Sequence, residues 1–339
     1  MTEAPILDVR DLAVTFRTEG GALTVVNDVS FSVRRGETLA LVGESGSGKS
    51  VTSLAILRLL PPAPRCTVSG SIRFIGRDGQ ARSLLDLDAG AMRAVRGDEI
   101  SMIFQEPMTS LNPVHRIGDQ IAEAVTFHRG VGRKAALARA EELLELVGIP
   151  EPRRRLAAYP HHLSGGMRQR VMIAMALACD PSLLIADEPT TALDVTVQAG
   201  IIDLLKSLQA KTGMAIIFVT HNLGVVAEIA DSVMVMYAGR IVERGDAVGL
   251  LQRPRMPYTQ GLLSAVPRID RLDFGGGALP TIPGNVPDPG RLPPGCSFHP
   301  RCAHARPGAC DATVPALEEA GAGRVVRCHL WREIEAVGA

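Results

Sequence analysis

The residues of this chain best suited to chemistry form a glycine-rich segment. Residues 43–50 read Gly-Glu-Ser-Gly-Ser-Gly-Lys-Ser, a spacing typical of loops that bind nucleotide phosphates. Glycines let successive backbone N–H groups turn toward phosphate oxygens, and the helix that follows offers its positive end. Lys49 is expected to reach the β- and γ-phosphates, and the Ser50 hydroxyl to ligate Mg²⁺. The segment therefore predicts a nucleotide-binding loop, and a merely flexible Gly/Ser loop is the weaker interpretation.

Two carboxylates form a second candidate site. Asp187 and Glu188 directly follow the apolar residues 183–186, and in open α/β sheets ligands bind at the carboxyl ends of the strands. Asp187 is placed to hold the Mg²⁺ shell, and Glu188 to orient or deprotonate an attacking water. Taken alone, the pair could equally be a solvated acidic turn. Together with the glycine-rich loop, it predicts hydrolytic chemistry.

A third segment combines small residues with a helix. Residues 163–166, Leu-Ser-Gly-Gly, lead into an apolar helix expected over 167–178. The N-terminus of that helix is free to face an anion, although Ser164 could simply cap the helix. The position of the segment shortly before Asp187 favours a part in the same site.

Alternating strands and helices must position these residues. The apolar run at 38–42 predicts a buried parallel strand before the loop, and 49–60 predicts a helix after it, stopped by Pro61 and Pro62. The alternation predicts an α/β fold with a parallel sheet. Other expected elements are half-exposed strands at 6–16 and 30–33, a hairpin at 70–79, mainly helical chain from 106 to about 160 with a helix at 133–147, and buried strands at 183–186 and 214–220.

Composition and charge exclude several classes of protein. At 339 residues the chain exceeds the usual size of a single core, so we expect a main domain with an attachment. Its 36 basic and 36 acidic residues balance, which gives no electrostatic reason to expect nucleic-acid binding. No apolar run reaches the roughly 18–20 residues of a membrane helix, and the N-terminus does not resemble a signal peptide. We expect a cytosolic protein without a membrane span of its own.

Taken together, the motifs resemble those of the ATP-binding subunits of ATP-binding-cassette (ABC) transporters. Residues 43–50 are similar to Walker A, 163–169 to the signature LSGGxxQ, and 183–188 to Walker B. Other family positions are matched by Gln105 (Q-loop), residues 191–194 (D-loop), His221 (switch histidine) and Phe16 (the aromatic residue that stacks on adenine). The resemblance implies a P-loop NTPase ABC cassette: a RecA-like α/β core, an antiparallel β subdomain and a helical insert at about 106–163.

The resemblance also implies roles for individual residues. Two cassettes meet head to tail, and Ser164 and Gly166 of one touch the γ-phosphate held by the other. Glu188, His221 and Gln105 are the implied catalytic residues, and Ser50, Gln105 and Asp187 the implied Mg²⁺ ligands. The implied nucleotide-binding residues are Phe16, Gly43, Glu44, Ser45, Gly46, Ser47, Gly48, Lys49, Ser50, Val51, Ser164, Gly165, Gly166 and Asp194.

Further stretches resemble one branch of the family, the dipeptide/oligopeptide importers. They are residues 102–113, 255–259 (Arg-Met-Pro-Tyr-Thr), 282–284 (Ile-Pro-Gly) and 295–302. This resemblance implies an ATP-hydrolysing subunit that powers the import of di- or oligopeptides. Importers of nickel or glutathione share the pattern, so the cargo stays open. An exporter ATPase fits less well because of the long tail, and a soluble ABC ATPase because the chain is neutral with a single cassette.

The same resemblance implies partners, a location and a domain division. The partners are a second ABC ATPase subunit, homologous or identical, two integral membrane permease subunits and an extracytoplasmic solute-binding protein, without nucleic acid. The location is peripheral, at the cytoplasmic face of the inner membrane. We expect a nucleotide-binding domain at 1–262, and at 263–339 a proline-rich linker with a Cys-rich C-terminal module of the oligopeptide-transporter type.

Four of the six cysteines gather near the C-terminus: Cys296, Cys302, Cys310 and Cys328. By number, four thiolates suit Zn²⁺ or a [4Fe–4S] cluster equally. The lack of a Cys-x₂-Cys pair weakens zinc, for which His299, His304 and His329 are spare ligands, and unligated thiols are the third possibility. The resemblance to peptide-importer subunits favours a [4Fe–4S] cluster that would hold a tail with little core of its own. Cys66 and Cys179 are expected to be buried thiols.

Overall fold

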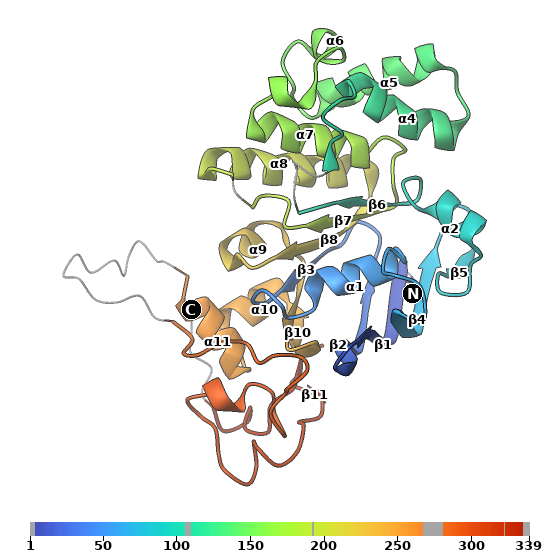
Figure 1. Ribbon diagram of the computed structural model, residues 1–339. Helices are drawn as coiled ribbons and strands as arrows, with labels where there is room; N and C mark the ends of the chain where they lie inside the picture. The colour runs from blue at the N-terminus through green and yellow to red at the C-terminus, as the bar shows by residue number, and fades with distance from the viewer. Residues whose placement is uncertain (1–3, 106–109, 192, 267–280, 322, 335–339) are drawn as a thin grey trace, which may run out of the picture. The chain divides into compact units, whose positions relative to one another are not determined.

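The computed structural model describes residues 4–105, 110–191, 193–266, 281–321 and 323–334 (Figure 1). The chain forms two compact units. The first comprises Met1–Leu7, Val33–Glu37 and Arg73–Phe218, and the second Asp8–Ser32, Thr38–Ile72 and Val219–Ala339.

Two buried parallel strands carry the site residues of the first unit. Strand β6 (Ile100–Ile103) pairs with β7 (Leu183–Asp187). Every residue of β7 is buried, as expected for a parallel strand covered on both faces. Helix α8 (Val195–Thr212) leads into β8 (Ala215–Thr220), which is also buried throughout and continues into the second unit. Because β6 and β7 run parallel, the residues that follow them emerge at the same edge of the sheet.

The chain between β6 and β7 is mainly helical, which confirms the expected helical stretch within the described residues. Helices α4 (Ile117–Arg129) and α5 (Arg133–Leu146) lie side by side (Figure 1). Helix α5 buries Ala136, Ala140, Leu143 and Leu144, the spacing of an amphipathic helix. The other elements of this stretch are α6 (Pro152–Arg155), the 3₁₀ helix η1 (Pro160–His162) and α7 (Gly165–Ala176). Residues 106–109 of the expected Q-loop segment lie outside the described residues.

The second unit is built on a mixed sheet with the strand order β3-β9-β10-β12-β11. Strand β3 (Thr38–Val42) is parallel to β9 (Ser232–Tyr237), and β10 (Arg240–Asp246) is antiparallel to β9. The C-terminal part of the chain after residue 263 is called the tail. Two of its short strands, β12 (Val325–Val326) and β11 (Glu318–Glu319), extend this sheet in antiparallel fashion. The tail is thus hydrogen-bonded to the strand that follows β9.

A second sheet contains β2 (Gly21–Val33), β1 (Leu7–Thr18) and β4 (Cys66–Ile75), in that order. The end of β4 lies in the first unit, where it pairs antiparallel with β5 (Ala81–Ser83), followed there by α2 (Ala89–Val95). A hairpin is therefore present, but its strands lie at 66–75 and 81–83, so the second strand falls outside the expected bounds of 70–79. The turn between β1 and β2 lies at Glu19 and Gly20.

The described helices of the second unit are α1 (Lys49–Ile56), α9 (Leu223–Ile229), α10 (Ala247–Gln252), α11 (Pro257–Ser264) and the 3₁₀ helix η3 (His299–Arg301). Residues of α9, α10 and α11 belong to one apolar cluster. The cluster joins Ala40 of β3 and Val235 of β9 with Phe298, Leu330 and Ile334 of the tail. The described tail residues therefore share a core with β3 and β9, while the domain boundary expected at residue 263 stays a prediction. Across the described ranges, the helices are too short or too polar to span a bilayer.

Candidate functional site

The glycine-rich loop connects β3 with α1 in the second unit. At Gly43 a Cβ atom would clash with the carbonyl oxygen of Met236 in β9, so a side chain does not fit. Gly46 and Gly48 have φ values of 79° and 103°, in the left-handed region that favours glycine. The loop therefore makes the tight turn that its sequence predicted for phosphate binding.

The N-terminus of α1 carries no side-chain cap. Gly48 occupies the N-cap position and makes no side-chain hydrogen bond, so it leaves the first N–H groups of the helix for other acceptors. Ser50 and Val51 are half-buried in the first turn. A phosphate group supplies the acceptors and the negative charge that such a helix end favours. This arrangement fits a bound nucleotide triphosphate.

Lys49 lies across the loop that precedes it. The side chain is buried, and Nζ donates hydrogen bonds to the carbonyl oxygens of Gly43 at 2.7 Å and of Glu44 at 2.9 Å. A buried ammonium group needs acceptors, and here the loop itself supplies them. Phosphate oxygens can replace these carbonyl oxygens, because they are stronger acceptors for a charged donor.

The other predicted site residues of the second unit are Phe16 and His221. Phe16 is half-buried on β1. His221 is exposed and directly follows β8. The next residue, Asn222, caps α9 by accepting a hydrogen bond from Gly224 N at 2.9 Å. His221 therefore occupies a tight strand-to-helix turn.

In the first unit, the structure brings two predicted catalytic residues together. Asp187 ends β7 and is 4% exposed, and Glu188 follows with a φ of 47°, an uncommon conformation for a residue with a side chain. Gln105 Nε2 donates to Glu188 Oε2 at 3.1 Å, and Thr191 Oγ1 donates to the same oxygen at 2.8 Å. The carboxylate is thus held in one orientation by an amide and a hydroxyl. The second of these contacts was not expected, although Thr191 stands in the predicted D-loop.

The signature segment lies at the N-terminus of α7. Ser164 caps this helix by accepting a hydrogen bond from Met167 N at 3.4 Å. The capping interpretation of Ser164 is therefore confirmed. Ser164 and Gly165 are exposed and Gly166 is half-buried. Gln169 is 2% exposed and donates to the carbonyl oxygen of Pro189. The signature helix is therefore tied to the chain that immediately follows Glu188.

Asp194 of the predicted D-loop has a structural role as the N-cap of α8. Its Oδ1 accepts a hydrogen bond from Val197 N at 2.9 Å. Ala192 of the same motif lies outside the described residues.

The predicted residues are divided between the units. The second unit holds Phe16, residues 43–51 and His221, and the first holds Gln105, residues 164–166, Asp187, Glu188 and Asp194. The roles of these residues toward a nucleotide stay predictions.

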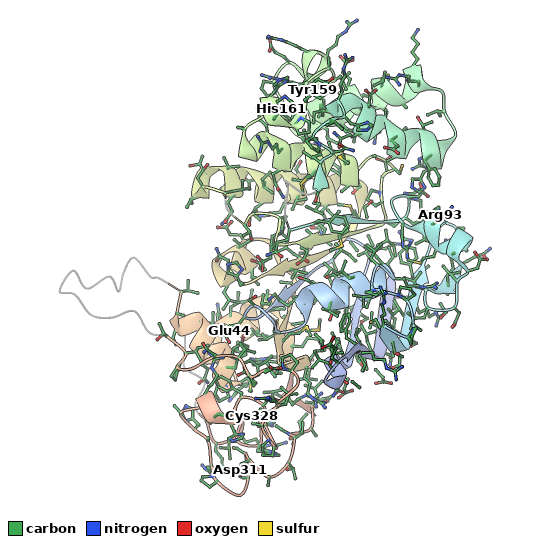
Figure 2. The ribbon with its side chains drawn as sticks, in the orientation of Figure 1. Glu44, Arg93, Tyr159, His161, Asp311 and Cys328 are labelled. Atoms are coloured by element: carbon green, nitrogen blue, oxygen red, sulfur yellow. The ribbon has the colours of Figure 1, made fainter. Side chains whose placement is uncertain are left out.

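Two residues that sequence reasoning did not place in the site contact Glu44. Its backbone N–H donates to Tyr258 Oη at 2.8 Å, and its carboxylate accepts from Arg301 Nη1 at 2.7 Å. Figure 2 shows Glu44 beside the C-terminal segment. Both partners lie in stretches that resemble peptide importers, but they are 214 and 257 residues away along the chain. The resemblance of these stretches to peptide importers was the only sequence feature that marked Tyr258 and Arg301. It did not assign a role to either residue.

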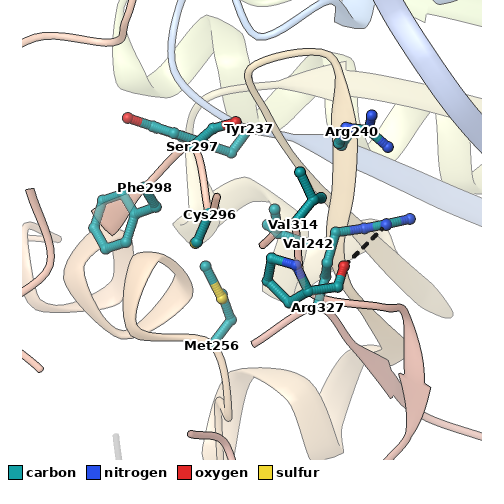
Figure 3. Close-up of a pocket in the computed structure, with 10 residues that line it drawn as sticks. Tyr237, Arg240, Val242, Met256, Cys296, Ser297, Phe298, Val314 and Arg327 are labelled. Carbon is teal, nitrogen blue, oxygen red and sulfur yellow. Dashed lines mark hydrogen bonds between the residues drawn. The ribbon is translucent and has the colours of Figure 1, made fainter. Parts of the chain in front are cut away.

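The four C-terminal cysteines line one small cavity together with Phe298 and Leu330. Figure 3 shows Cys296 near Phe298 and Met256 in the adjoining pocket. Burial raises the pKa of the Cys296 and Cys302 thiols and raises the pKa of Cys328 to about 12.

The metal predicted for these cysteines is not supported. Among the residues that the structure describes, no three His, Cys, Asp or Glu side chains are grouped so as to hold a metal ion. Two of the spare histidines contact backbone oxygens instead: His299 Nδ1 lies 2.9 Å from Cys296 O, and His329 Nε2 lies 2.9 Å from Thr313 O. Within the described residues, the structure therefore gives no support for the cluster or for its zinc alternative. As expected, Cys66 and Cys179 are buried free thiols.

Comparisons with known proteins agree with the motifs. Residues 26–191 match the family model described as ABC transporter, and residues 242–310 match the model described as oligopeptide/dipeptide transporter, C-terminal region. A putative peptide import ATP-binding protein of Brucella melitensis is 56% identical, with 99% of this chain and 100% of that protein covered. A probable peptide ABC transporter ATP-binding protein of Sinorhizobium fredii is 53% identical, with 98% and 96% covered.

A solved structure has a similar fold over part of this chain. It is the dimeric post-hydrolysis state of the ATP-binding cassette MJ0796 bound to ADP and Pi, with a TM-score of 0.62 and 28% identity. The match covers 71% of this chain and 98% of that one.

Proposed function

This chain belongs to the ABC transporter family and has the fold of an ABC ATP-binding cassette, and on that premise we propose that it is the ATP-binding and ATP-hydrolysing subunit of an importer for di- or oligopeptides. The observation that carries the ATP part is the loop at 43–50, with its left-handed glycines, buried lysine and uncapped helix. The peptide part is supported by the relatives named for peptide import and by the match at 242–310.

The side chains around the loop suit the binding of MgATP. Lys49 exchanges two backbone carbonyl oxygens for the oxygens of the β- and γ-phosphates. Phe16 stacks on the adenine. By the family resemblance, Ser50, Gln105 and Asp187 are the residues that would hold Mg²⁺, which would neutralise charge on the phosphates.

Hydrolysis depends on Glu188, whose carboxylate takes a proton from the attacking water. Gln105 and Thr191 keep that carboxylate oriented. His221 holds the γ-phosphate and positions the water. Gln105 also directly precedes the helical insert. This insert transmits changes at the nucleotide site to the other subunits of the transporter.

A second cassette completes the site. Ser164 and Gly165 are exposed at the N-terminus of α7, and a helix end with small residues suits the γ-phosphate held by another cassette. That partner is a homologous or identical ATPase subunit. The similar cassette MJ0796 is described as dimeric, which supports the pairing.

The remaining partners follow from the same function. Two integral membrane permease subunits form the path, and an extracytoplasmic solute-binding protein delivers the cargo. The location that goes with this function is peripheral, at the cytoplasmic face of the inner membrane. Within the chain, the nucleotide-binding domain covers residues 1–262 and the C-terminal region covers residues 263–339.

Nucleotide binding is tested with the full-length chain and Lys49→Ala. Isothermal titration with MgATP is expected to show binding by the wild type and a loss of at least ~10²-fold in Lys49→Ala, because a charged donor to the phosphates is removed. Lys134→Ala, on α5, is the matched control and should bind as the wild type does. Equal affinity of the Lys49 variant and the wild type would contradict the assignment of the loop.

The identity of the cargo is tested by measuring solute uptake in cells in which the gene for this chain carries Glu188→Gln. Uptake of labelled di- and oligopeptides is expected to be lost. If peptide uptake persists and uptake of nickel or glutathione is lost, the importer serves that solute instead.

The iron–sulfur cluster is a separate prediction that the structure does not support. Iron, zinc and acid-labile sulfide are measured in protein purified without oxygen. About four iron and four sulfide per chain indicate the cluster, one zinc indicates a zinc site, and neither indicates free thiols.

A further inference from the structure

Three stretches that follow residue 254 meet at Glu44 of the phosphate-binding loop. Residues 255–259, 282–284 and 295–302 have no role in the site proposed above. They supply Tyr258, the carbonyl oxygens of Ile282 and Pro283, and Arg301. Each of these groups contacts Glu44 or the arginine that binds Glu44.

Arg301 binds the Glu44 carboxylate in a bidentate manner. Nη1 lies 2.7 Å from Oε2, and Nη2 lies 3.0 Å from Oε1. Its other donors bind Pro283 O at 2.8 Å, Tyr237 Oη at 3.4 Å and Ile282 O at 3.4 Å. All five N–H groups of the guanidinium therefore have an acceptor. Lysine cannot reproduce this planar fork.

The guanidinium is buried against aromatic rings. Arg301 is 8% exposed and lies over Tyr237 at 5.9 Å and Phe298 at 6.0 Å from the ring centroids. Tyr258 lies 4.6 Å from Tyr237 and 5.3 Å from Phe298, between ring centroids. A buried charge is costly unless it is paired, so the position of Arg301 is coupled to the position of Glu44.

Glu44 is held at three points. Arg301 binds the side chain, Tyr258 Oη accepts from the backbone N–H at 2.8 Å, and the carbonyl oxygen accepts from Lys49 Nζ at 2.9 Å. The preceding residue, Gly43, packs closely against β9. Two of the three contacts of Glu44, and the close packing of Gly43, thus involve residues outside the loop: Tyr258, Arg301 and Met236.

We propose that Arg301 is a positioning residue for the phosphate-binding loop, and that through Glu44 the C-terminal region sets the affinity of the loop for MgATP. The proposal rests on the proposed function, because it requires that the loop bind nucleotide. Arg301 acts through Glu44 and does not itself touch the nucleotide. Small displacements of a binding group cost large factors in affinity or rate, so losing this contact should be easy to detect.

The test is a double-mutant cycle on the full-length chain. MgATP affinity is measured by isothermal titration for the wild type, Arg301→Gln, Glu44→Gln and the double variant. Each single variant is expected to weaken binding by ~10-fold or more, and the double variant by no more than the worse single one, because both act through one contact. Arg306→Gln is the matched control, since it removes an exposed ion pair with Glu333 in the same region.

Thermal unfolding without nucleotide separates positioning from general stability. Arg301→Lys keeps the charge and most of the bulk, and it is expected to remain folded yet bind MgATP more weakly, because the fork is lost. Wild-type affinity in a folded Arg301 variant, or a lower unfolding temperature with unchanged affinity, would overturn the proposal. So would effects of the two single substitutions that multiply in the double variant. If the wild type itself does not bind MgATP, the proposed function fails instead.

Discussion

Glu188 is the residue on which the hydrolytic chemistry depends. It follows β7 in a left-handed conformation, with a φ of 47°, and its Oε2 accepts hydrogen bonds from Gln105 and Thr191. Strained backbone of this kind persists where surrounding contacts hold it, and it clusters at functional sites. The carboxylate is therefore presented in a defined direction, as a general base requires.

Replacing Glu188 by glutamine is expected to separate binding from hydrolysis. The amide keeps the shape of the side chain but cannot take a proton, so ATP turnover should fall by at least ~10²-fold while MgATP affinity stays near that of the wild type. Phosphate release and isothermal titration measure the two quantities. Glu142→Gln, at an exposed position of α5, is the control, and near-normal turnover in the Glu188 variant would contradict the assignment.

At this scale, the sequence predicted the residues whose motifs are local. The loop at 43–50 and the Asp187–Glu188 pair are each contained in a few consecutive positions, so their chemistry is visible without a fold. Tyr258 and Arg301 are different. They reach Glu44 only after the chain has folded, and no spacing along the sequence indicates such a contact.

Among the elements, α1 shows why boundaries are hard to predict. The prolines at 61 and 62 suggested a helix that continues to residue 60, whereas α1 ends at Ile56. Leu59 N bonds back to Leu54 O, and Arg58 N to Ala55 O, with Arg58 at a φ of 50°. This is a Schellman ending. It usually has glycine at the left-handed position, so an arginine there gave no signal.

Strand β2 was predicted too short for a related reason. Residues 30–33 alternate apolar and polar side chains, but the strand already begins at Gly21. Its first part is mostly exposed or half-buried, so burial does not impose an apolar pattern there. Pairing with the neighbouring strand β1 extends it instead.

The attachment of the tail to the sheet gives a prediction about stability. Glu243 of β10 is fully buried and accepts hydrogen bonds from Arg324 Nη2 at 2.7 Å and Arg255 N at 2.8 Å. Arg324→Met keeps the aliphatic bulk but leaves this carboxylate without its cation. The free energy of unfolding should fall by about 3–5 kcal/mol, as measured by denaturant titration.

The control for that substitution is Arg306→Met, in the exposed pair with Glu333. Exposed ion pairs contribute little, so this variant should unfold close to the wild type. Equal stability of the two variants would show that the Arg324–Glu243 pair does not fasten the tail.

For the whole molecule, the order of the motifs predicted the family, and the comparisons confirm it. The organisation of the tail could not be predicted in the same way. Its prolines and cysteines suggested a small module with little core, held by a metal. In the structure its apolar residues join the core of β3 and β9, and β12 extends the sheet. The residues that make those contacts are far apart along the chain. Their positions in the tail sequence form no periodic pattern.

In the proposed function, this chain powers a membrane importer. The most direct measurement is a pull-down of the tagged native protein in mild detergent, with its partners identified by mass spectrometry. Two integral membrane subunits, a sister cassette and a solute-binding protein are the expected partners, and that binding protein can then be assayed for peptides. Recovery of ribosomal or DNA-repair proteins without any membrane protein would leave the ATPase chemistry intact and contradict the transport function.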